Sequence, residues 1–176
     1  MKLKQLLTAI KYRAEQVPDV DITDLVYDSR KAVPGCAFVC LRGANADGHK
    51  YAKMAAEKGA AVIIAEEIVE APVPVILTDN TRLALAYLSA EFFGHPAEQM
   101  HVIGITGTKG KTTTAFMMRS ILEAAGHKTG VIGTIGVLYG DTLIQTDNTT
   151  PENYEVQKSV SYTHLRAHET YSYLVC

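Results

Sequence analysis

Short apolar runs separated by turn residues recur through the first half of the chain. The runs are residues 22–27, 36–41, 61–65 and 73–77, with Pro34 and Gly35 between the first two. The runs 61–65 and 73–77 are almost continuously apolar, which is typical of strands that are covered on both faces of a sheet. This pattern predicts an α/β domain with a buried sheet.

Helical patterns lie between these apolar runs. The first is residues 1–15, and the second is residues 49–60, in which Gly59 stands where a helix ends. A third helix is predicted from Asn80 and Thr81, which can cap its N-terminus, to Phe93. The breakers in Gly94-His95-Pro96 follow it, so a first domain is predicted over residues 1–98.

A second series of elements begins after this boundary. Residues 101–106 predict a buried strand, residues 111–125 a helix that Gly126 ends, and residues 129–137 another strand. Strand, loop, helix and strand form one βαβ unit, which is expected to be parallel and right-handed. The residues that follow are too few for a full parallel sheet. We therefore expect residues 99–158 to be the beginning of an incomplete domain.

Composition excludes several classes of function. The net charge is −2 and the sequence pI is about 6.3, so no basic surface for nucleic acid is indicated. No apolar run is long enough to span a bilayer, and the N-terminus is a poor signal peptide. We expect a cytoplasmic monomer without nucleic-acid partners or membrane insertion.

The cysteines and histidines give no clear metal site. Cys36 and Cys40 lie four residues apart on one face of a predicted strand, and we interpret them as small core residues rather than a redox or metal pair. The histidines outside the C-terminal segment flank predicted strands or helices, and we expect them to be capping or surface residues: they are His49, His95, His101 and His127.

The stretch GITGTKGKTTT, residues 104–114, joins the predicted strand to the predicted helix. Its spacing from Gly107 to Gly110 is shorter than that of the common phosphate-binding loop. Glycines allow the backbone to approach phosphate oxygens, Lys111 can place a charge on the β- and γ-phosphates, and the Thr112 hydroxyl suits Mg²⁺. The alternative is a glycine turn before an ordinary helix. The strand before and the helix after favour a phosphate site.

Three ordered segments resemble the Mur ligases, the amino-acid-adding enzymes of peptidoglycan precursor synthesis. TGTKGKTTT is similar to the ATP loop of that family. Residues 27–66 resemble its UDP-sugar-binding N-terminal domain, and DNTTPENYEVQ, residues 147–157, resembles a stretch downstream of its ATP loop. The resemblance covers residues 1–158 and implies a small αβ UDP-sugar-binding domain, followed by the start of a parallel-sheet ATPase domain.

The resemblance also implies roles for particular residues. ATP would be bound by Gly107, Thr108, Lys109, Gly110, Lys111, Thr112 and Thr113, with Lys111 and Thr112 acting in catalysis and Thr112 on the metal. The uridine diphosphate end of the substrate would be held by Ser29, Ala44, Asn45 and Ala46, and its muramoyl-peptide part by Asn148, Thr149 and Thr150.

Two of these assignments have structural alternatives. Asp28-Ser29-Arg30 can be an Asx or Ser turn with a surface arginine, which needs no ligand. Thr150 followed by Pro151 can be the N-cap of a helix. A helix N-terminus that faces an anionic substrate would serve both purposes.

The reaction implied by the resemblance is ATP-dependent amide formation. With ATP and Mg²⁺, L-lysine or meso-diaminopimelate would be joined to UDP-MurNAc-L-Ala-D-Glu through an acyl phosphate, and the loop would neutralise charge on the γ-phosphate. Three alternatives stay open. One is the related ligase that adds the terminal D-Ala-D-Ala, another is an NTPase of a different class, and the third is a non-catalytic UDP-sugar and ATP-binding module.

The last residues depart from the family pattern. SVSYTHLRAHETYSYLVC, residues 159–176, has no clear helical or strand period, and we interpret it as a sequence artefact. The chain would then lack most of the ATPase sheet and the domain that binds the incoming amino acid. We expect no turnover by this chain alone.

Overall fold

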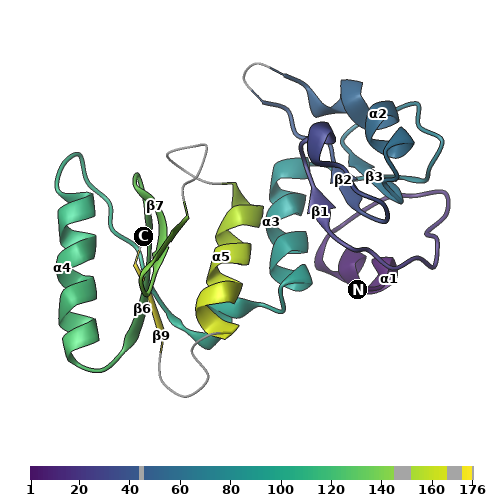
Figure 1. Ribbon diagram of the computed structural model, residues 1–176. Helices are drawn as coiled ribbons and strands as arrows, with labels where there is room; N and C mark the ends of the chain where they lie inside the picture. Colours follow the sequence, from purple (N-terminus) through teal and green to yellow (C-terminus); the bar gives the residue numbers. More distant parts are fainter. Residues whose placement is uncertain (44–45, 145–151, 166–171, 176) are drawn as a thin grey trace. The chain divides into compact units, whose positions relative to one another are not determined.

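Four parallel strands form the sheet of the first unit, Met1–Phe92. In sheet order they are β1 (Leu25–Val26), β2 (Ala37–Val39), β3 (Val62–Ala65) and β4 (Val75–Leu77). Every residue of β2 and β3 is buried, as expected for parallel strands covered on both faces. Figure 1 shows the computed structural model, which describes residues 1–43, 46–144, 152–165 and 172–175, but not the side chains of 162–165 and 172.

Helices cover both faces of this sheet (Figure 1). The helical segments are α1 (Leu3–Leu6), η1 (Leu7–Ala9), η2 (Ser29–Lys31), η3 (Gly48–Tyr51), α2 (Ala52–Glu57) and α3 (Thr81–Phe92). On one face Phe38 and Ile63 pack with Ala52 and Ala55 of α2. Leu85 and Leu88 of α3 are completely buried, as are the leucines of α1. The predicted α/β class is confirmed for this unit.

Cys36 and Cys40 belong to the core on the α2 side. Both side chains are fully buried, and both are free thiols that form no disulfide. Burial raises the pKa of the Cys40 thiol to about 12 and also raises the pKa of Cys36. Since buried thiols with raised pKa values stay protonated, these residues act as small apolar core residues, as the sequence indicates.

The first helix is shorter than the predicted 1–15. After η1 the chain becomes extended, and Arg13 pairs with Leu77 at the edge of β4 in an isolated antiparallel bridge. The Arg13 N–H donates to the Leu77 carbonyl at 2.8 Å, and the reverse bond has the same length. The bridge gives the N–H and the carbonyl of Leu77, on an edge strand, hydrogen-bond partners. Residues 10–15 therefore do not continue the helix that their apolar pattern predicts.

The second unit, Phe93–Cys176, has a mixed five-stranded sheet. Its strands in sheet order are β5 (His101–Ile103), β9 (Ser172–Val175), β6 (Lys128–Gly133), β7 (Gly136–Tyr139) and β8 (Thr142–Ile144). β5, β9 and β6 are parallel, whereas β6, β7 and β8 are antiparallel neighbours.

The prediction of a single strand over residues 129–137 is wrong. The segment is a hairpin, turned between Gly133 and Gly136, where Gly136 has a φ of 111°.

One helix covers each face of the second sheet (Figure 1). α4 (Lys111–Ala124) packs Ala115 and Leu122 against Val131 and Val175, and α5 (Asn153–Leu165) packs Val160 against Ile132 and Leu174. The short η4 (Pro96–Gln99) precedes β5. No helix within the described ranges is long and apolar enough to cross a membrane.

The C-terminal segment takes part in this fold. α5 continues to Leu165, and β9 lies between β5 and β6 in the parallel part of the sheet. Leu174 and Val175 of β9 are buried, one on each face. A four-residue strand is too short to show a period in sequence. The origin that we assigned to residues 159–176 stays a prediction.

Candidate functional site

Both units place their candidate residues at the carboxyl ends of parallel strands. In the first unit Ser29 follows β1, Arg42 follows β2 and Glu66 follows β3. In the second unit the glycine-rich loop follows β5. Ligands of open parallel sheets bind in crevices at this edge, so these segments form the candidate site of each unit.

The turn after β1 has the alternative structure considered from the sequence. Asp28 caps η2 by accepting a hydrogen bond from the Arg30 N–H at 2.9 Å. The Arg30 guanidinium also binds the Asp28 carboxylate, with Nη2 2.8 Å from Oδ2, and this contact lowers the pKa of Asp28. Ser29 is buried within the turn. A structural turn therefore accounts for Asp28 and Arg30, and substrate contact by Ser29 stays a prediction.

A tight hairpin follows β2. Arg42 and Asp47 form an antiparallel bridge, and the Gly43 N–H donates to the Ala46 carbonyl at 2.9 Å. Ala46 is exposed, whereas the predicted substrate residues Ala44 and Asn45 lie outside the described residues. Gly43 and Ala46, on either side of these two residues, therefore lie at the carboxyl edge of the sheet.

The hairpin is packed closely against the end of β2 at Gly48. The Gly48 N–H donates to the Leu41 carbonyl at 2.8 Å. A Cβ at this position would lie 2.8 Å from the Leu41 nitrogen and 2.9 Å from the Leu41 oxygen. Both are backbone atoms that cannot move independently of the strand.

Gly48→Ala is therefore expected to destabilise the first unit by about 1–3 kcal/mol. Gly133→Ala is the matched control, because a Cβ on Gly133 meets no atom within 4 Å and its φ is not positive. Urea denaturation of the two variants, followed by circular dichroism, measures the difference. Equal unfolding midpoints would contradict the close packing at Gly48.

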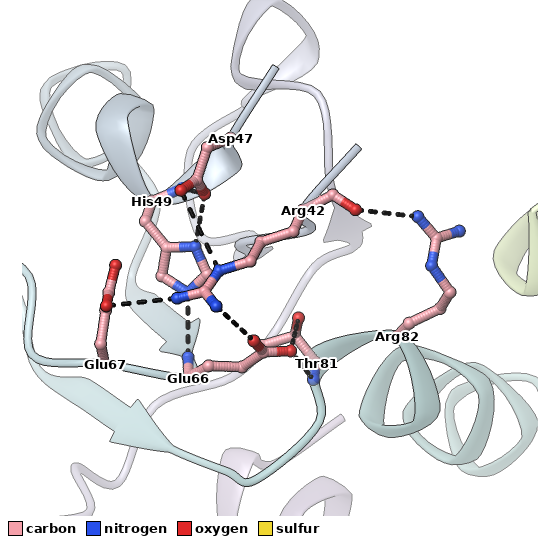
Figure 2. A network of polar contacts seen from close by, with 7 residues as sticks. All are labelled: Arg42, Asp47, His49, Glu66, Glu67, Thr81 and Arg82. Carbon is pink, nitrogen blue, oxygen red and sulfur yellow. Dashed lines mark hydrogen bonds and ion pairs between the residues drawn. The ribbon is translucent and has the colours of Figure 1, made fainter. Parts of the chain in front are cut away.

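His49 is the centre of a hydrogen-bonded network, which Figure 2 shows. Its side chain is only 3% exposed, and its Nδ1 lies 2.6 Å from Oδ1 of Asp47. Its Nε2 accepts a hydrogen bond from the backbone N–H of Glu66 at 3.0 Å. The sequence-based expectation that His49 is a capping or surface residue is wrong, because this imidazole is buried and bonded at both nitrogens.

Glu66 connects the end of β3 to the beginning of α3. Its Oε1 accepts hydrogen bonds from the Thr81 N–H and from the Thr81 hydroxyl, both at 2.9 Å. Burial raises the pKa of Glu66, but the Thr81 hydrogen bonds and the nearby Arg42 outweigh burial, and the net pKa is lowered. Glu66 is thus an ionised carboxylate at the N-terminus of α3, where the helix dipole favours it.

Arg42 brings the acidic groups of the network together. Its guanidinium lies 3.2 Å from Glu67, 3.7 Å from Glu66 and 4.0 Å from Asp47. The Arg42 side chain is half exposed, and its carbonyl accepts a hydrogen bond from Arg82 at 3.4 Å. His49 is the main cause that lowers the pKa of Asp47, and Arg42 contributes to it.

Asp47, His49 and Glu67 bring potential metal-ligand atoms within 4.8 Å of one another. Both nitrogens of His49 already make hydrogen bonds, one to Asp47 and one to the Glu66 N–H. Glu67 is paired with Arg42. Contacts within the protein therefore account for the position of each of these side chains without a metal ion.

The glycine-rich loop of the second unit has the backbone that the sequence predicts. Gly107 has a φ of 150° and Gly110 a φ of 81°, and both conformations favour glycine. Gly110 is the N-cap of α4 and has no side chain that could accept a capping hydrogen bond from the N–H groups of the first helical turn. These N–H groups and the helix dipole favour an anion at this point.

The side chains of the loop fit a nucleotide phosphate. Lys111, Thr112 and Thr113 are exposed at the start of α4, as are Thr108 and Lys109 in the loop. The Lys111 ammonium donates to the Gly107 carbonyl and so lies across the loop. A Cβ on Gly110 would meet no atom within 4 Å, which leaves open space beside the backbone N–H groups. An ammonium, backbone donors and a hydroxyl form a suitable donor set for phosphate with Mg²⁺.

The third predicted segment, Asn148, Thr149 and Thr150, lies outside the described residues. α5 begins at Asn153, three residues after Thr150. Both the proposed substrate contact and the alternative helix cap therefore stay predictions.

Sequence reasoning missed the network in the first unit. Arg42 and Glu66 each follow an apolar run directly, and Thr81 was considered only as a helix cap. The sequence does contain one signal for this network: Arg42 and Glu66 each follow a predicted strand. Parallel strands bring their carboxyl ends to one edge of the sheet, so residues in these positions lie near one another.

Comparisons with known proteins identify two related domain models. The model described as the Mur ligase family, catalytic domain, matches residues 21–93. The model described as the Mur ligase middle domain matches residues 105–174. The first match covers the hairpin and the His49 network, and the second covers most of the phosphate loop and reaches into β9.

Two curated relatives share 48% and 42% of the aligned residues with the chain. The chain is 48% identical over 163 residues to the UDP-N-acetylmuramoyl-L-alanyl-D-glutamate–2,6-diaminopimelate ligase of Bacillus licheniformis, with 90% of this chain and 33% of the relative aligned. It is 42% identical over 163 residues to the ligase of that name from Clostridium botulinum, with 90% and 34% aligned. The chain spans about a third of the length of these relatives.

Solved structures show the same fold. A structure of a UDP-N-acetylmuramoyl-L-alanyl-D-glutamate–2,6-diaminopimelate ligase superposes with a TM-score of 0.78 at 21% identity, over all of this chain and 36% of that chain. MurF from Acinetobacter baumannii superposes with a TM-score of 0.66 at 28% identity, over 98% of this chain and 34% of that chain.

Proposed function

The chain belongs to the Mur ligase family, and from this premise we propose that it supplies the UDP-sugar-binding and ATP-binding parts of an ATP-dependent ligase of peptidoglycan precursor synthesis. The observation that carries the proposal is the phosphate loop, which has an open helix N-terminus, Lys111 and Thr112 together after β5. The ligase would join an amino acid to UDP-MurNAc-L-Ala-D-Glu by activating the glutamyl carboxylate as an acyl phosphate.

The second unit would bind ATP through the residues of its loop. The backbone N–H groups from Gly107 to Thr113 would contact the phosphates, and Lys111 would exchange the Gly107 carbonyl for a γ-phosphate oxygen. Thr112 would offer its hydroxyl to Mg²⁺, which when bound neutralises charge on the phosphates. The loop supplies fixed donors and positive charge where negative charge develops, which is how phosphoryl transfer is catalysed.

The first unit would bind the uridine diphosphate end of the substrate. The residues proposed for this contact are Ser29 in the turn after β1, and Ala44, Asn45 and Ala46 in the hairpin after β2. Of these residues the structure describes Ser29 and Ala46, which follow the neighbouring parallel strands β1 and β2. Asn148, Thr149 and Thr150 are proposed for the muramoyl-peptide part.

The names of the relatives favour 2,6-diaminopimelate as the amino acid that the ligase adds. The curated relatives described above are ligases for this amino acid, at 48% and 42% identity. MurF is the ligase that adds the terminal D-Ala-D-Ala, which is the alternative considered above. A MurF structure is similar to this chain at 28% identity. We therefore propose addition of the third amino acid rather than of the terminal dipeptide, in a monomeric cytoplasmic enzyme.

Calorimetric titration of the chain tests this proposal. We expect one site for ATP with Mg²⁺, and a separate site for UDP-MurNAc-L-Ala-D-Glu that UDP alone also occupies. UDP-MurNAc-tripeptide is the matched ligand for the alternative, and we expect it to bind less tightly than the dipeptide form. Tighter binding of the tripeptide form would favour the MurF-type reaction, and binding of neither nucleotide would overturn the proposal.

A further inference from the structure

We propose that Arg119 is a positioning residue of the ATP site, which fixes α4 on the sheet of the second unit so that the first turn of α4 and Lys111 keep the place that binds phosphate. This inference rests on the proposed function, which assigns ATP to the loop before α4. Arg119 lies eight residues after Lys111, about 12 Å along a helix. Its guanidinium binds Glu123, one turn further from the loop, so Arg119 acts through α4 and not on the ligand.

Apolar packing by itself holds α4 only weakly. Among the fourteen residues of this helix, Ala115 alone is buried. Leu122 is partly buried against the sheet, whereas Met117 and Ile121 are 62% and 67% exposed. Burial of apolar surface is the main force that docks a helix in a fold. Because α4 buries so little, its position depends on further contacts.

Arg119 makes two such contacts. Its Nε donates to Oε1 of Glu123 at 2.7 Å, and its Nη2 donates to the Gly140 carbonyl at 2.9 Å. Gly140 lies in the turn between β7 and β8. The Arg119 side chain is only 16% exposed, and hydrogen bonds of charged groups are stronger away from water. The guanidinium therefore ties α4 to the β7–β8 turn.

Glu123 extends this tie to β6. The same oxygen, Oε1, accepts a hydrogen bond from the Thr129 hydroxyl at 2.7 Å, and Thr129 is buried in β6. Burial raises the pKa of Glu123, but the bonds from Thr129 and Arg119 outweigh burial, and the net pKa is lowered. Arg119, Glu123, Thr129 and the Gly140 carbonyl thus form one polar clamp between α4 and the sheet.

The clamp does not serve to stabilise α4 as an isolated helix. Glu123 lies in the last turn of α4, where the helix dipole disfavours a negative charge. An arginine four residues before a glutamate is also the less favourable order for such a pair within a helix. The contacts with Thr129 and Gly140 therefore account for this arrangement better than helix stability does.

The clamp can set the geometry of the ATP site because the loop and α4 are continuous. Gly110 is the N-cap of α4 and Lys111 is its first residue. Ala115 contacts the sheet near the beginning of α4, and the clamp holds α4 near its end. Both contacts are needed to fix the direction of the helix. Without the clamp, α4 can turn about Ala115, and the N–H groups of its first turn then leave the place where they converge on phosphate.

Two substitutions test the clamp by calorimetric titration of the full chain with ATP and Mg²⁺. Arg119→Met removes both hydrogen bonds of the guanidinium but keeps an unbranched side chain of high helix propensity. We expect it to weaken ATP binding about tenfold, and Thr129→Val, which removes only the bond to β6, to weaken it about threefold. Since Thr129→Val changes no charge, its loss separates positioning from removal of a positive charge.

Val160→Ala is the control for a general loss of stability. Val160 is 1% exposed and belongs to α5, which covers the other face of the sheet. Its truncation leaves a cavity and is expected to lower the thermal unfolding midpoint, but to change ATP affinity less than about twofold. Amide NMR spectra give a second readout without ATP. The shifts of Gly107–Thr113 are expected to change in Arg119→Met and to stay as they are in Val160→Ala.

Equal ATP affinity in the unchanged chain and in Arg119→Met would overturn the inference, as would an equal loss in Val160→Ala. If Arg119→Met does not fold, Thr129→Val decides by the same criteria. Failure of the proposed function gives a different result, in which the unchanged chain binds no ATP. The loop amides then decide alone: a change of their shifts in Arg119→Met supports positioning by Arg119, and unchanged shifts overturn it.

Discussion

Lys111→Ala is expected to weaken the binding of ATP with Mg²⁺ to the chain about 100-fold. The Lys111 ammonium stands at the first position of α4 and lies across the loop on the Gly107 carbonyl. A phosphate in the loop would replace this neutral acceptor by a charged one, and hydrogen bonds between charged partners contribute about 1.5–3 kcal/mol. About 2.7 kcal/mol corresponds to 100-fold in affinity.

Titration calorimetry of the variant with ATP and Mg²⁺ measures this loss, and Lys128→Ala is the control. Lys128 is also exposed and in the second unit, but it begins β6, beyond the end of α4 opposite to the loop. We expect its removal to change ATP affinity less than threefold, since an exposed charge this far away is screened by salt at about 8–10 Å. Equal losses in the two variants would indicate a general effect of charge rather than phosphate binding by Lys111.

The second unit shows which parts of a fold a short local pattern can predict. The loop, its glycines and the helix from Lys111 could be predicted, because strand, glycine turn and helix are local features that follow one another. The hairpin at Gly133 and Gly136 was read as one strand, since apolar residues continue through it and the turn has only Thr134 and Ile135 between its glycines. The pairing of β9 between β5 and β6 depends on distant residues, which no local period reveals.

The site of the first unit shows a different limit of prediction from sequence. Apolar runs predicted its strands, and their parallel order brings Ser29, Arg42 and Glu66 to one edge. Asp47, two residues before His49, is a local partner, but the contact that encloses the other ring nitrogen comes from the Glu66 N–H, seventeen residues later. A hydrogen bond to so distant a backbone group depends on the register of β2 and β3. Sequence reasoning could place the loops but not the network that holds them.

Glu66→Ala is expected to destabilise the first unit by about 2–3 kcal/mol. The carboxylate accepts two hydrogen bonds from Thr81, at the start of α3, and faces Arg42. Alanine leaves the Thr81 N–H and its buried hydroxyl without these partners, and an unsatisfied buried donor costs about 1–3 kcal/mol. Asn80 still caps the Leu83 N–H at 2.8 Å, so α3 is expected to persist while its contact with β3 weakens.

The neighbouring Glu67→Ala is the matched control for this loss. Glu67 has the same chemistry and also binds Arg42, at 3.2 Å, but its side chain is 57% exposed and an exposed ion pair contributes about 0–1 kcal/mol. Native-state hydrogen exchange of the β3 amides, Val62–Ala65, gives the free energy of opening for each variant. If Glu67→Ala lowers it as much as Glu66→Ala does, the loss arises from the shared ion pair with Arg42. If only Glu66→Ala lowers it, the stability of this edge depends on the hydrogen bonds between Glu66 and α3.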